Sequence, residues 1–249
     1  MYLPDIPPGS AMSMHAILPV LDLYAGQVVH AIRGERQHYH PISSRLTSST
    51  KPLHVAKAIR DHYGFNDLYL ADLDAIAGKT PDFPLYEALV QEGFSLWVDA
   101  GILTLSTAIM VQACGVAKVI IALETCPAPL LMDAILSRLG TDTIVFSLDL
   151  RAGMPLAPDP GWEADTVVDL ATDIYRRGIR QMILLDLMQV GTGQGTGTTD
   201  LCQQLHQRLP ELSIITGGGI RTIADVDEQL SHGATRVLVA TALHQGTLF

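Results

Sequence analysis

Basic residues are scarce in this 249-residue chain: 16 lysines and arginines stand against 26 aspartates and glutamates, a formal net charge of −10. Binding to phosphate backbones or anionic lipids needs a basic surface, so this balance argues against nucleic acids and membranes as partners. No stretch approaches the ~18–20 apolar residues of a membrane span. The first residues also lack the basic start and apolar run of a signal peptide. We therefore predict an intracellular, cytoplasmic protein.

Cysteine is rare as well. Cys114, Cys126 and Cys202 are odd in number and share neither a CxxC motif nor a Cys/His spacing typical of metal sites. We interpret them as reduced, buried thiols. The content of 48% hydrophobic and 17% charged residues excludes a disordered chain. A chain of this length can bury a sizeable core without disulfides or a structural metal.

Short apolar runs recur along the chain with amphipathic segments between them. The runs are rich in Val, Ile and Leu without polar alternation, which is typical of strands buried on both faces of a parallel sheet. The eight predicted strands are 16–23, 67–73, 95–99, 118–123, 143–150, 181–187, 212–216 and 236–241. The seven predicted helices are 54–62, 85–91, 105–113, 129–139, 167–177, 200–208 and 223–230. This alternation predicts an α/β protein, and eight strands close best as a (β/α)8 TIM barrel.

The predicted barrel is one full helix short. Only residues 244–249 follow the last strand, so the closing helix is shortened. An extension over residues 1–14 precedes the first strand. We predict that this extension or a neighbouring subunit covers the wall that the missing helix would protect, which leaves a homo-oligomer open.

The sequence repeats itself at about half its length. The matching segments are 19–23 with 146–150, 70–73 with 184–187, 99–102 with 217–220, and 119–122 with 237–240. Two fused half-barrels are the simplest explanation of such a repeat. We therefore predict one barrel domain over 1–249, with half-barrels at about 15–140 and 141–249.

Carboxylates gather where the predicted strands end, which is where TIM barrels carry their active sites. The set is Asp22, Asp72, Asp74, Asp99, Glu124, Asp149 and Asp186. Asp22 and Asp149 belong to the first and fifth strands and so face one another across the barrel. We predict them as the catalytic acid and base, with burial raising the pKa of one of them. For Asp72, Asp74 and Asp186, capping of helices or hydrogen bonding to loop amides is the simpler alternative.

Glycines follow the seventh predicted strand in the segment TGGGIR, and ATAL follows the eighth. Glycines let backbone amides approach a phosphate closely, and phosphate sites recur after strands seven and eight of TIM barrels. We predict that Gly218, Gly219, Ala240 and Thr241 bind a phosphate group of a small-molecule substrate.

Several motifs follow one another in a specific order. They are LPVLDL with QVVHAI and RGE, YLADLDA, LLDLMQVGTGQG, TGGGIRT and VLVATALHQG. Between residues 16 and 246 this set resembles the HisA/HisF family of histidine biosynthesis, which contains the ProFAR isomerase and the imidazole-glycerol-phosphate cyclase. The resemblance implies that Asp22 and Asp149 are the catalytic pair. It also implies an isomerase that converts an aminoaldose into an aminoketose, an Amadori rearrangement, without a cofactor or a metal.

The chain departs from that family at two parts of the expected site. The isomerase has a DGT motif whose aspartate donates a proton, and here Val190 stands in its place. The family substrate carries two phosphates, yet the first-half glycines are replaced by Asp99 and Ala100, with Glu124 nearby. Carboxylates there would repel a phosphate and would suit an amine, a hydroxylated group or a metal. We therefore expect a monophosphorylated aminosugar-type substrate.

The predicted substrate-binding residues are Asp99, Glu124, Asp186, Thr192 and Arg33. Arg33 lies in the first loop, which is expected to cover the substrate. The segment GTGQGTGTT at 191–199 is interpreted as a mobile lid, because a dinucleotide motif would need an earlier βαβ context.

Two other classes of protein remain open. Asp72, Asp99 and Glu124 at neighbouring strand ends favour a lyase or metal-dependent enzyme. Such an enzyme could belong to tetrahydromethanopterin- or methanofuran-linked one-carbon metabolism, where HisA/HisF-related proteins also occur. Val190 and the altered phosphate site favour a non-catalytic ligand-binding barrel.

Overall fold

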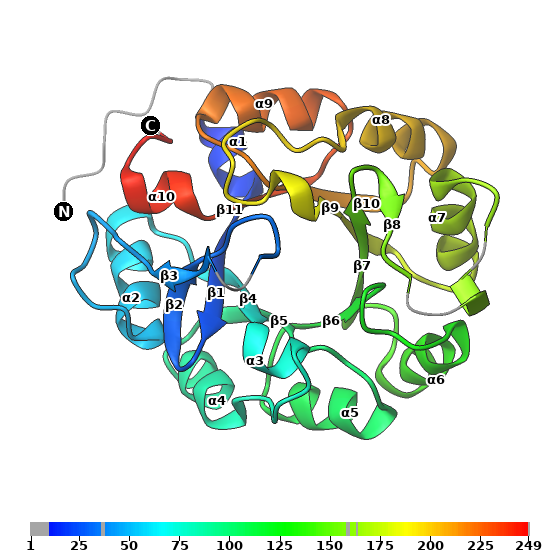
Figure 1. The fold of residues 1–249 in the computed structure, drawn as a ribbon, viewed down its shortest axis with the longest axis horizontal. Coiled ribbons are helices and arrows are strands. Elements are labelled where there is room, and N and C mark those ends of the chain that lie inside the picture. Colours follow the sequence, from blue (N-terminus) through cyan, green and yellow to red (C-terminus); the bar gives the residue numbers. More distant parts are fainter. Residues whose placement is uncertain (1–9, 36–37, 158–159, 163, 249) are drawn as a thin grey trace.

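Eight parallel strands form a closed barrel in the computed structural model, which describes residues 10–35, 38–157, 160–162 and 164–248 (Figure 1). The strands are β1 (Ile17–Tyr24), β4 (Asp67–Asp72), β5 (Ser95–Asp99), β6 (Lys118–Ala122), β7 (Ile144–Arg151), β9 (Gln181–Asp186), β10 (Ser213–Gly217) and β11 (Arg236–Val239). Each pairs in parallel with the next in that order, and β11 pairs back onto β1. The predicted TIM barrel is therefore confirmed.

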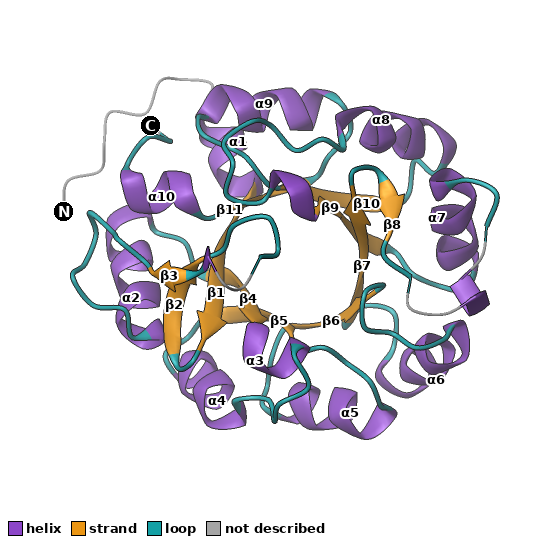
Figure 2. Ribbon diagram, in the orientation of Figure 1, coloured by secondary structure: helices purple, strands orange, loops and turns teal. Residues whose placement is uncertain are grey.

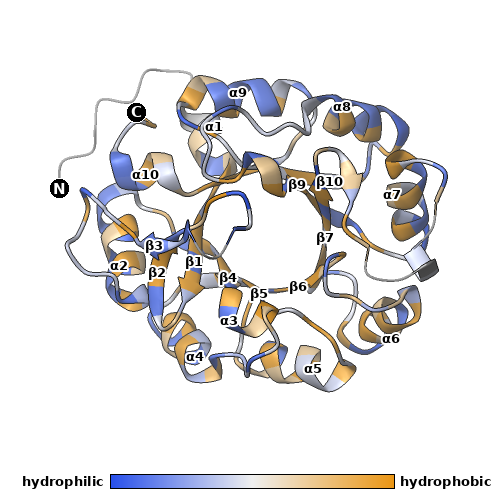
Figure 3. Ribbon diagram, viewed as in Figure 1, coloured by the Kyte–Doolittle hydropathy of each residue, from blue (hydrophilic) through white to orange (hydrophobic). Residues whose placement is uncertain are grey.

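Helices surround the barrel on the outside (Figure 2). The long ones are α2 (Pro52–Tyr63), α4 (Phe83–Gln91), α5 (Leu105–Ala113), α6 (Pro129–Leu139), α7 (Val167–Arg176), α8 (Thr199–Arg208) and α9 (Ile223–Ser231). Short helical turns are α3 (Leu73–Ile76), η2 (Pro160–Trp162) and η3 (Leu187–Gln189). Figure 3 shows apolar and polar stretches alternating on the outer helices, and in α2 the buried side chains Val55, Ala56, Ile59 and Tyr63 recur at helical spacing. This is the pattern that amphipathic periodicity predicts.

Two short helices lie where the predicted barrel was incomplete. The closing helix α10 (Thr241–Gln245) has five residues, as the sequence indicated. The Tyr63 hydroxyl of α2 donates a hydrogen bond of 2.9 Å to the Leu243 carbonyl of α10, which joins the last helix to the first long one. Helix α1 (Ser10–Ala16) packs against α9 and β11, and Ser13 donates a hydrogen bond to Asp227. Part of the predicted extension thus contacts the barrel wall, while residues 1–9 lie outside the described residues.

Two tight hairpins extend the barrel at its C-terminal rim. After β1 the chain turns into β2 (Gln27–His30), which pairs with β3 (His40–Pro41); after β7 it turns into β8 (Met154–Pro155). Positive φ angles occur at both turn residues in each hairpin, at Ala25, Gly26, Ala152 and Gly153. Such angles are typical of type I′ turns, whose twist matches that of the strands they join.

The core has two layers. Large apolar side chains fill the space between barrel and helices. The barrel interior holds a smaller cluster: Leu18, Tyr69, Ala71, Trp97, Ile120, Val145, Ile183, Ile215 and Leu238. Successive residues of a strand point to opposite faces, so every second side chain contributes to this inner cluster. A cavity lies against this inner cluster and includes Tyr69, Ala71 and Leu238 in its wall.

Candidate active site

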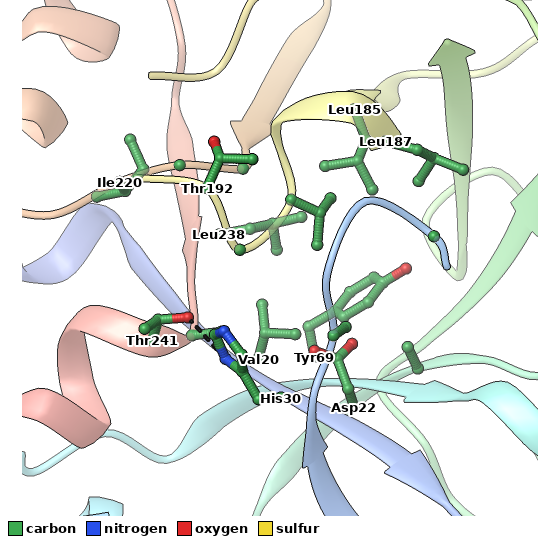
Figure 4. Close-up of a pocket in the computed structure, with 18 of the residues that line it drawn as sticks. Val20, Asp22, His30, Tyr69, Leu185, Leu187, Thr192, Ile220, Leu238 and Thr241 are labelled. Carbon is green, nitrogen blue, oxygen red and sulfur yellow. Dashed lines mark hydrogen bonds between the residues drawn. The ribbon is translucent and has the colours of Figure 1, made fainter. Parts of the chain in front are cut away.

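A cavity of about 470 Å³ lies at the C-terminal ends of the barrel strands (Figure 4). Polar side chains from five strands face it: Asp22 from β1, His30 from β2, Tyr69 from β4, Asp99 from β5 and Asp149 from β7. Apolar side chains also line the cavity, among them Val20, Leu185 and Leu238 (Figure 4). A concave, partly apolar site with a few converging polar groups is typical of small-molecule binding.

The structure brings most of the predicted site residues into this one cavity. Those that line it are Asp22, Asp149, Gly218, Gly219, Ala240, Thr241, Asp99, Glu124 and Thr192. Asp186 and Arg33 do not line it. Val190, which stands where the isomerase pattern has a proton-donating aspartate, also faces the cavity.

Asp22 and Asp149 occupy equivalent places on opposite sides of the barrel. Each is the sixth residue of an eight-residue strand, and both strands continue beyond it into a hairpin. Asp149 accepts hydrogen bonds from Ser147 Oγ at 2.7 Å and from the Glu124 amide at 3.2 Å. The side chain of Asp22 accepts no hydrogen bond from any residue that the structure describes.

Burial raises the pKa of both carboxyl groups into the neutral range. It raises the pKa of Asp22 to about 7. The pKa of Asp149 is raised to about 8, mainly by burial and further by the charges of Asp99 and Glu124, against the hydrogen bonds that stabilise its carboxylate. A carboxyl group with a pKa near the working pH can both donate and accept a proton.

Tyr69 lies among three carboxyl groups. Its hydroxyl donates a hydrogen bond to Asp99 Oδ2 at 3.4 Å, and Figure 4 shows its ring beside Asp22. Burial and the charges of Asp99, Asp149 and Asp22 raise the pKa of the phenol well above 10. The Tyr69 hydroxyl therefore keeps its proton and can act as a hydrogen-bond donor in the site. Tyr69 was not predicted as a site residue from the sequence, because a tyrosine in an apolar strand such as β4 is ordinarily interpreted as a core residue.

The loops after β10 and β11 form one end of the cavity. Gly218 and Gly219 have φ angles of +90° and +67°, which favour glycine. Their amides donate no hydrogen bond to any described residue, and the amide of Thr241 in the first turn of α10 is also unpaired within that part of the chain. Three unpaired amides at the edge of a cavity can receive an anion.

The corresponding loop after β5 differs chemically. Asp99 is buried and its Oδ1 accepts a hydrogen bond of 3.1 Å from the Gly101 amide. Burial raises the pKa of Asp99 to about 6. Glu124 is exposed at the rim, and its carboxylate pairs with none of the described residues. At this end, the Gly101 amide already donates its hydrogen bond to the Asp99 carboxylate, so it is not available to a phosphate.

The carboxylate of Asp186 binds the amides of neighbouring loops. Asp186 accepts hydrogen bonds from the amides of Ala152, Gly153 and Met188 at 2.8–3.1 Å. These contacts are the loop-amide alternative considered for Asp186. Its carboxylate therefore supports the β7–β8 hairpin from outside the cavity.

Asp72 and Asp74 also bind neighbouring groups. Asp72 accepts from the Ala75 and Asp82 amides and from the Tyr86 hydroxyl, the last at 2.6 Å. Asp74 accepts from the Ala25 amide at 2.6 Å and pairs with Lys79 at 2.7 Å. Both carboxylates thus position the loop that follows β4.

The loop after β9 packs onto the loop that follows β2. The Arg33 amide donates a hydrogen bond of 3.0 Å to the Val190 carbonyl, while the Arg33 side chain is exposed. A Cβ added to Gly191 would lie 2.3 Å from the Ala31 carbonyl oxygen, so only glycine fits there. Thr192 Oγ1 donates to the Gln189 carbonyl at 2.9 Å and lies at the cavity wall.

Candidate metal ligands do not converge in the part of the chain that the structure describes. No group of three or more His, Cys, Asp or Glu side chains is placed there to hold a metal ion. Cys114, Cys126 and Cys202 are buried and free. Among the described residues, no helix has the length and apolar character needed to cross a membrane.

The fold is that of a TIM barrel, and the cavity lies at the C-terminal ends of its strands, where TIM-barrel enzymes carry their active sites. A family model described as histidine biosynthesis protein matches residues 16–248, and the chain belongs to that family. This confirms the resemblance drawn from the sequence motifs.

Relatives of this chain include enzymes and an uncharacterized protein. Two phosphoribosyl imidazole-4-carboxamide isomerases, the ProFAR isomerases, are similar over most of their length. The Lacticaseibacillus casei enzyme is 27% identical over 237 residues, 93% of this chain and 95% of the relative. The Deinococcus radiodurans enzyme is 28% identical over 239 residues, 93% and 94%. An uncharacterized protein from Methanocaldococcus jannaschii is 29% identical over 234 residues, 93% and 94%. None of these three names refers to one-carbon cofactor chemistry, so that alternative stays untested.

Proposed function

We propose that this protein is an isomerase that converts a phosphorylated aminoaldose into an aminoketose, with Asp22 and Asp149 as the catalytic residues. The observation that carries the proposal is the pair of opposed carboxyl groups in one cavity, both with pKa values raised into the neutral range. Membership of the histidine biosynthesis family and similarity to ProFAR isomerases support the same reaction class.

Because burial raises the pKa of both carboxyl groups into the neutral range, each can exchange a proton with the substrate. In the proposed reaction Asp149 is the acid and Asp22 is the base. Asp149 gives its proton to the ring oxygen of the sugar, the C1–O bond breaks, and an iminium forms at C1. Asp22 then takes the proton from C2, which produces an enolamine. Asp22 returns this proton to C1, and Asp149 accepts the proton of the C2 hydroxyl as the ketone forms. Both carboxyl groups end as they began, and no electrons leave the substrate.

We further propose that the substrate carries one phosphate, held by the amides of Gly218, Gly219 and Thr241 and by the loop at Ala240. The unpaired amides at this end of the cavity support that placement. At the other end of the cavity, the Asp99 carboxylate accepts the hydrogen bond of the Gly101 amide, and Glu124 adds a second carboxylate. A second phosphate there would meet negative charge in a partly buried site. An amine or a hydroxylated group would instead find acceptors.

Turnover of two matched compounds tests the proposal. One is ProFAR, with two phosphates, and the other is an N-aryl ribosylamine 5-phosphate, with one. We expect ketose formation from the monophosphate at a higher kcat/KM than from ProFAR. Removing a positioned acid or base typically costs about 10²–10⁴-fold in rate, so Asp22→Asn and Asp149→Asn should each lower kcat by that much.

Three outcomes decide between the candidates. Turnover that survives Asp22→Asn would contradict the role of the pair. Preference for ProFAR would contradict the single-phosphate substrate and leave the isomerase reaction standing. Because Val190 removes one proton donor of the isomerase pattern, a non-catalytic barrel is the second candidate. Binding of the monophosphate without any turnover, unchanged in Asp22→Asn and Asp149→Asn, would favour it.

A further inference from the structure

His30 faces the same end of the cavity as the unpaired amides. It is the last residue of β2 and is half-buried in the cavity wall. Its Nδ1 lies 3.3 Å from Thr241 Oγ1, a hydrogen bond that Figure 4 marks with a dashed line. A phosphate held by Thr241 would therefore lie next to this imidazole.

The surroundings of His30 favour its uncharged form. The ring of His40 on β3 stacks on it with the centroids 5.3 Å apart. His244 of α10 lies close enough to interact electrostatically with His30, and it is buried against Ser44. Burial and the positive charge that His40 can carry both lower the pKa of His30, and no described carboxylate forms an ion pair with it.

We propose that His30 is a phosphate-binding residue that takes up a proton when a phosphate dianion binds. This inference rests on the proposed phosphate site at Gly218, Gly219 and Thr241. A dianion within hydrogen-bond reach of an imidazole stabilises the charged form, and the charged form in turn makes a stronger hydrogen bond. Arg151 and Arg221, both exposed, are the arginines that line the cavity among the described residues. His30 would thus add a positive charge to theirs only when the ligand is present.

Proton uptake has a measurable consequence for affinity. By linkage, a ligand that raises the pKa of a group binds more tightly at lower pH. Asp22, Asp99, Asp149 and Glu124 face the same cavity, and the first three have pKa values raised by burial. They can contribute to the total proton uptake. The part that belongs to His30 is therefore the difference between the wild type and a His30 variant.

Calorimetric titration with sulfate tests the inference, because sulfate stays a dianion across the pH range and does not itself titrate. Titrations at pH 6, 7 and 8, each in two buffers of different ionisation heat, give both the affinity and the number of protons taken up. For the wild type we expect an affinity that falls about five- to tenfold from pH 6 to pH 8, a coupling of ordinary size. His30→Gln should bind weakly at pH 6 and lose most of this dependence.

Two further variants make the result specific. His30→Lys carries a fixed charge and should bind sulfate at pH 8 as well as the wild type does at pH 6. His40→Gln removes the stacked neighbour and should keep the proton uptake. Thermal unfolding of each variant shows that it is folded.

The possible failures are distinguishable. An affinity and proton uptake that His30→Gln leaves unchanged would overturn the role of His30 while sulfate binding preserved the phosphate site. If neither sulfate nor inorganic phosphate binds the wild type at any pH, the phosphate site of the proposed function fails, and the inference fails with it.

Discussion

The amide of Gly195 donates a hydrogen bond to the carbonyl oxygen of Gly219 over 3.3 Å. This bond joins the loop after β9 to the loop after β10. The two backbones are so close that a Cβ added to Gly219 would lie 2.4 Å from the Gly195 carbonyl oxygen. The φ angle of Gly219, +67°, disfavours any side chain as well. The shape of the proposed phosphate loop therefore depends on this contact.

Gly219→Ala should weaken sulfate binding and lower stability. The left-handed conformation alone costs about 1–2 kcal/mol for a residue with a side chain, and the collision with Gly195 adds to it by moving the loop. The matched control is Gly195→Ala, whose φ is also positive, at +87°, but whose added Cβ meets open space. Thermal unfolding and sulfate titration of both variants check this. Equal losses of affinity would show that the close contact is unimportant.

Replacing Asp149 should stabilise the protein at high pH. Burial raises its pKa from 3.8 to about 8, so between these values the folded state binds more protons than the unfolded state. Stability must then fall as the pH rises through this window. Asp149→Asn removes the dependence and should raise the free energy of unfolding at pH 8 by on the order of 2 kcal/mol, with little effect at pH 4.

Chemical denaturation at pH 4, 6 and 8 measures that effect. Asp72→Asn is the control with the opposite sign, because its carboxylate accepts three hydrogen bonds, one of them from Tyr86. It should destabilise the protein at pH 8 by about 1–3 kcal/mol. If Asp149→Asn also destabilises the protein at pH 8, the ionised carboxylate of Asp149 costs the folded state less free energy than its burial implies.

Ser147→Ala should move the titration of Asp149 to higher pH. The Ser147 hydroxyl donates to Asp149 Oδ1 at 2.7 Å and lowers the pKa of Asp149 against the effect of burial. A hydrogen bond to a charged group is worth about 1.5–3 kcal/mol, so the pKa should rise by roughly one to two units. Carbon NMR of labelled aspartate gives the titration directly. An unchanged or lowered pKa would show that the hydroxyl does not stabilise the carboxylate.

Asp186→Asn should cost stability and leave ligand binding unchanged. The carboxylate accepts from the amides of Ala152, Gly153 and Met188, and an amide side chain cannot accept from all three. We expect a loss of about 1–3 kcal/mol in unfolding free energy, with sulfate affinity as in the wild type. A variant of normal stability that no longer binds substrate would instead support the substrate-binding role predicted from the sequence.

Asp99→Asn and Glu124→Gln together should raise the affinity for a bisphosphorylated ligand. These substitutions remove the negative charges that would oppose a second phosphate. They leave the proposed phosphate site at Gly218 unaltered. Competition between ProFAR and the monophosphate should shift several-fold toward ProFAR. Glu92→Gln is a control outside the cavity, where Glu92 pairs with Lys57. An unchanged ratio would mean that these carboxylates do not select against the second phosphate.

The strands and helices of the barrel were predictable because their signals are local. The predicted helices agree with α2 and α4 to α9 to within two residues at each end. Errors occurred where strands end: Ala16 belongs to α1, and Thr241 begins α10. Strand ends depend on pairing with neighbours, which a single segment does not reveal. Parallel closure then explains why Asp22 and Asp149, far apart in the chain, line one cavity.

The identities of Tyr69 and His30 as cavity residues needed the tertiary structure. Each stands in an apolar run where a core position is the ordinary interpretation. Which face of a strand turns inward is decided by its register against its neighbours, such as Tyr69 beside Trp97. The engagement of Asp186 by loop amides likewise depends on the β7–β8 hairpin, which residues 150–157 alone did not predict.

By itself, the sequence determined the α/β class, the barrel, the family and the rim on which the carboxylates gather, because repeated apolar strands and ordered motifs are properties of the linear chain. Only the tertiary structure decided which carboxylates face the cavity and which hold loops. It also decided that Asp22 and Asp149 titrate near neutral pH. Burial and hydrogen bonding set these properties, and both arise from residues that meet only when the barrel closes.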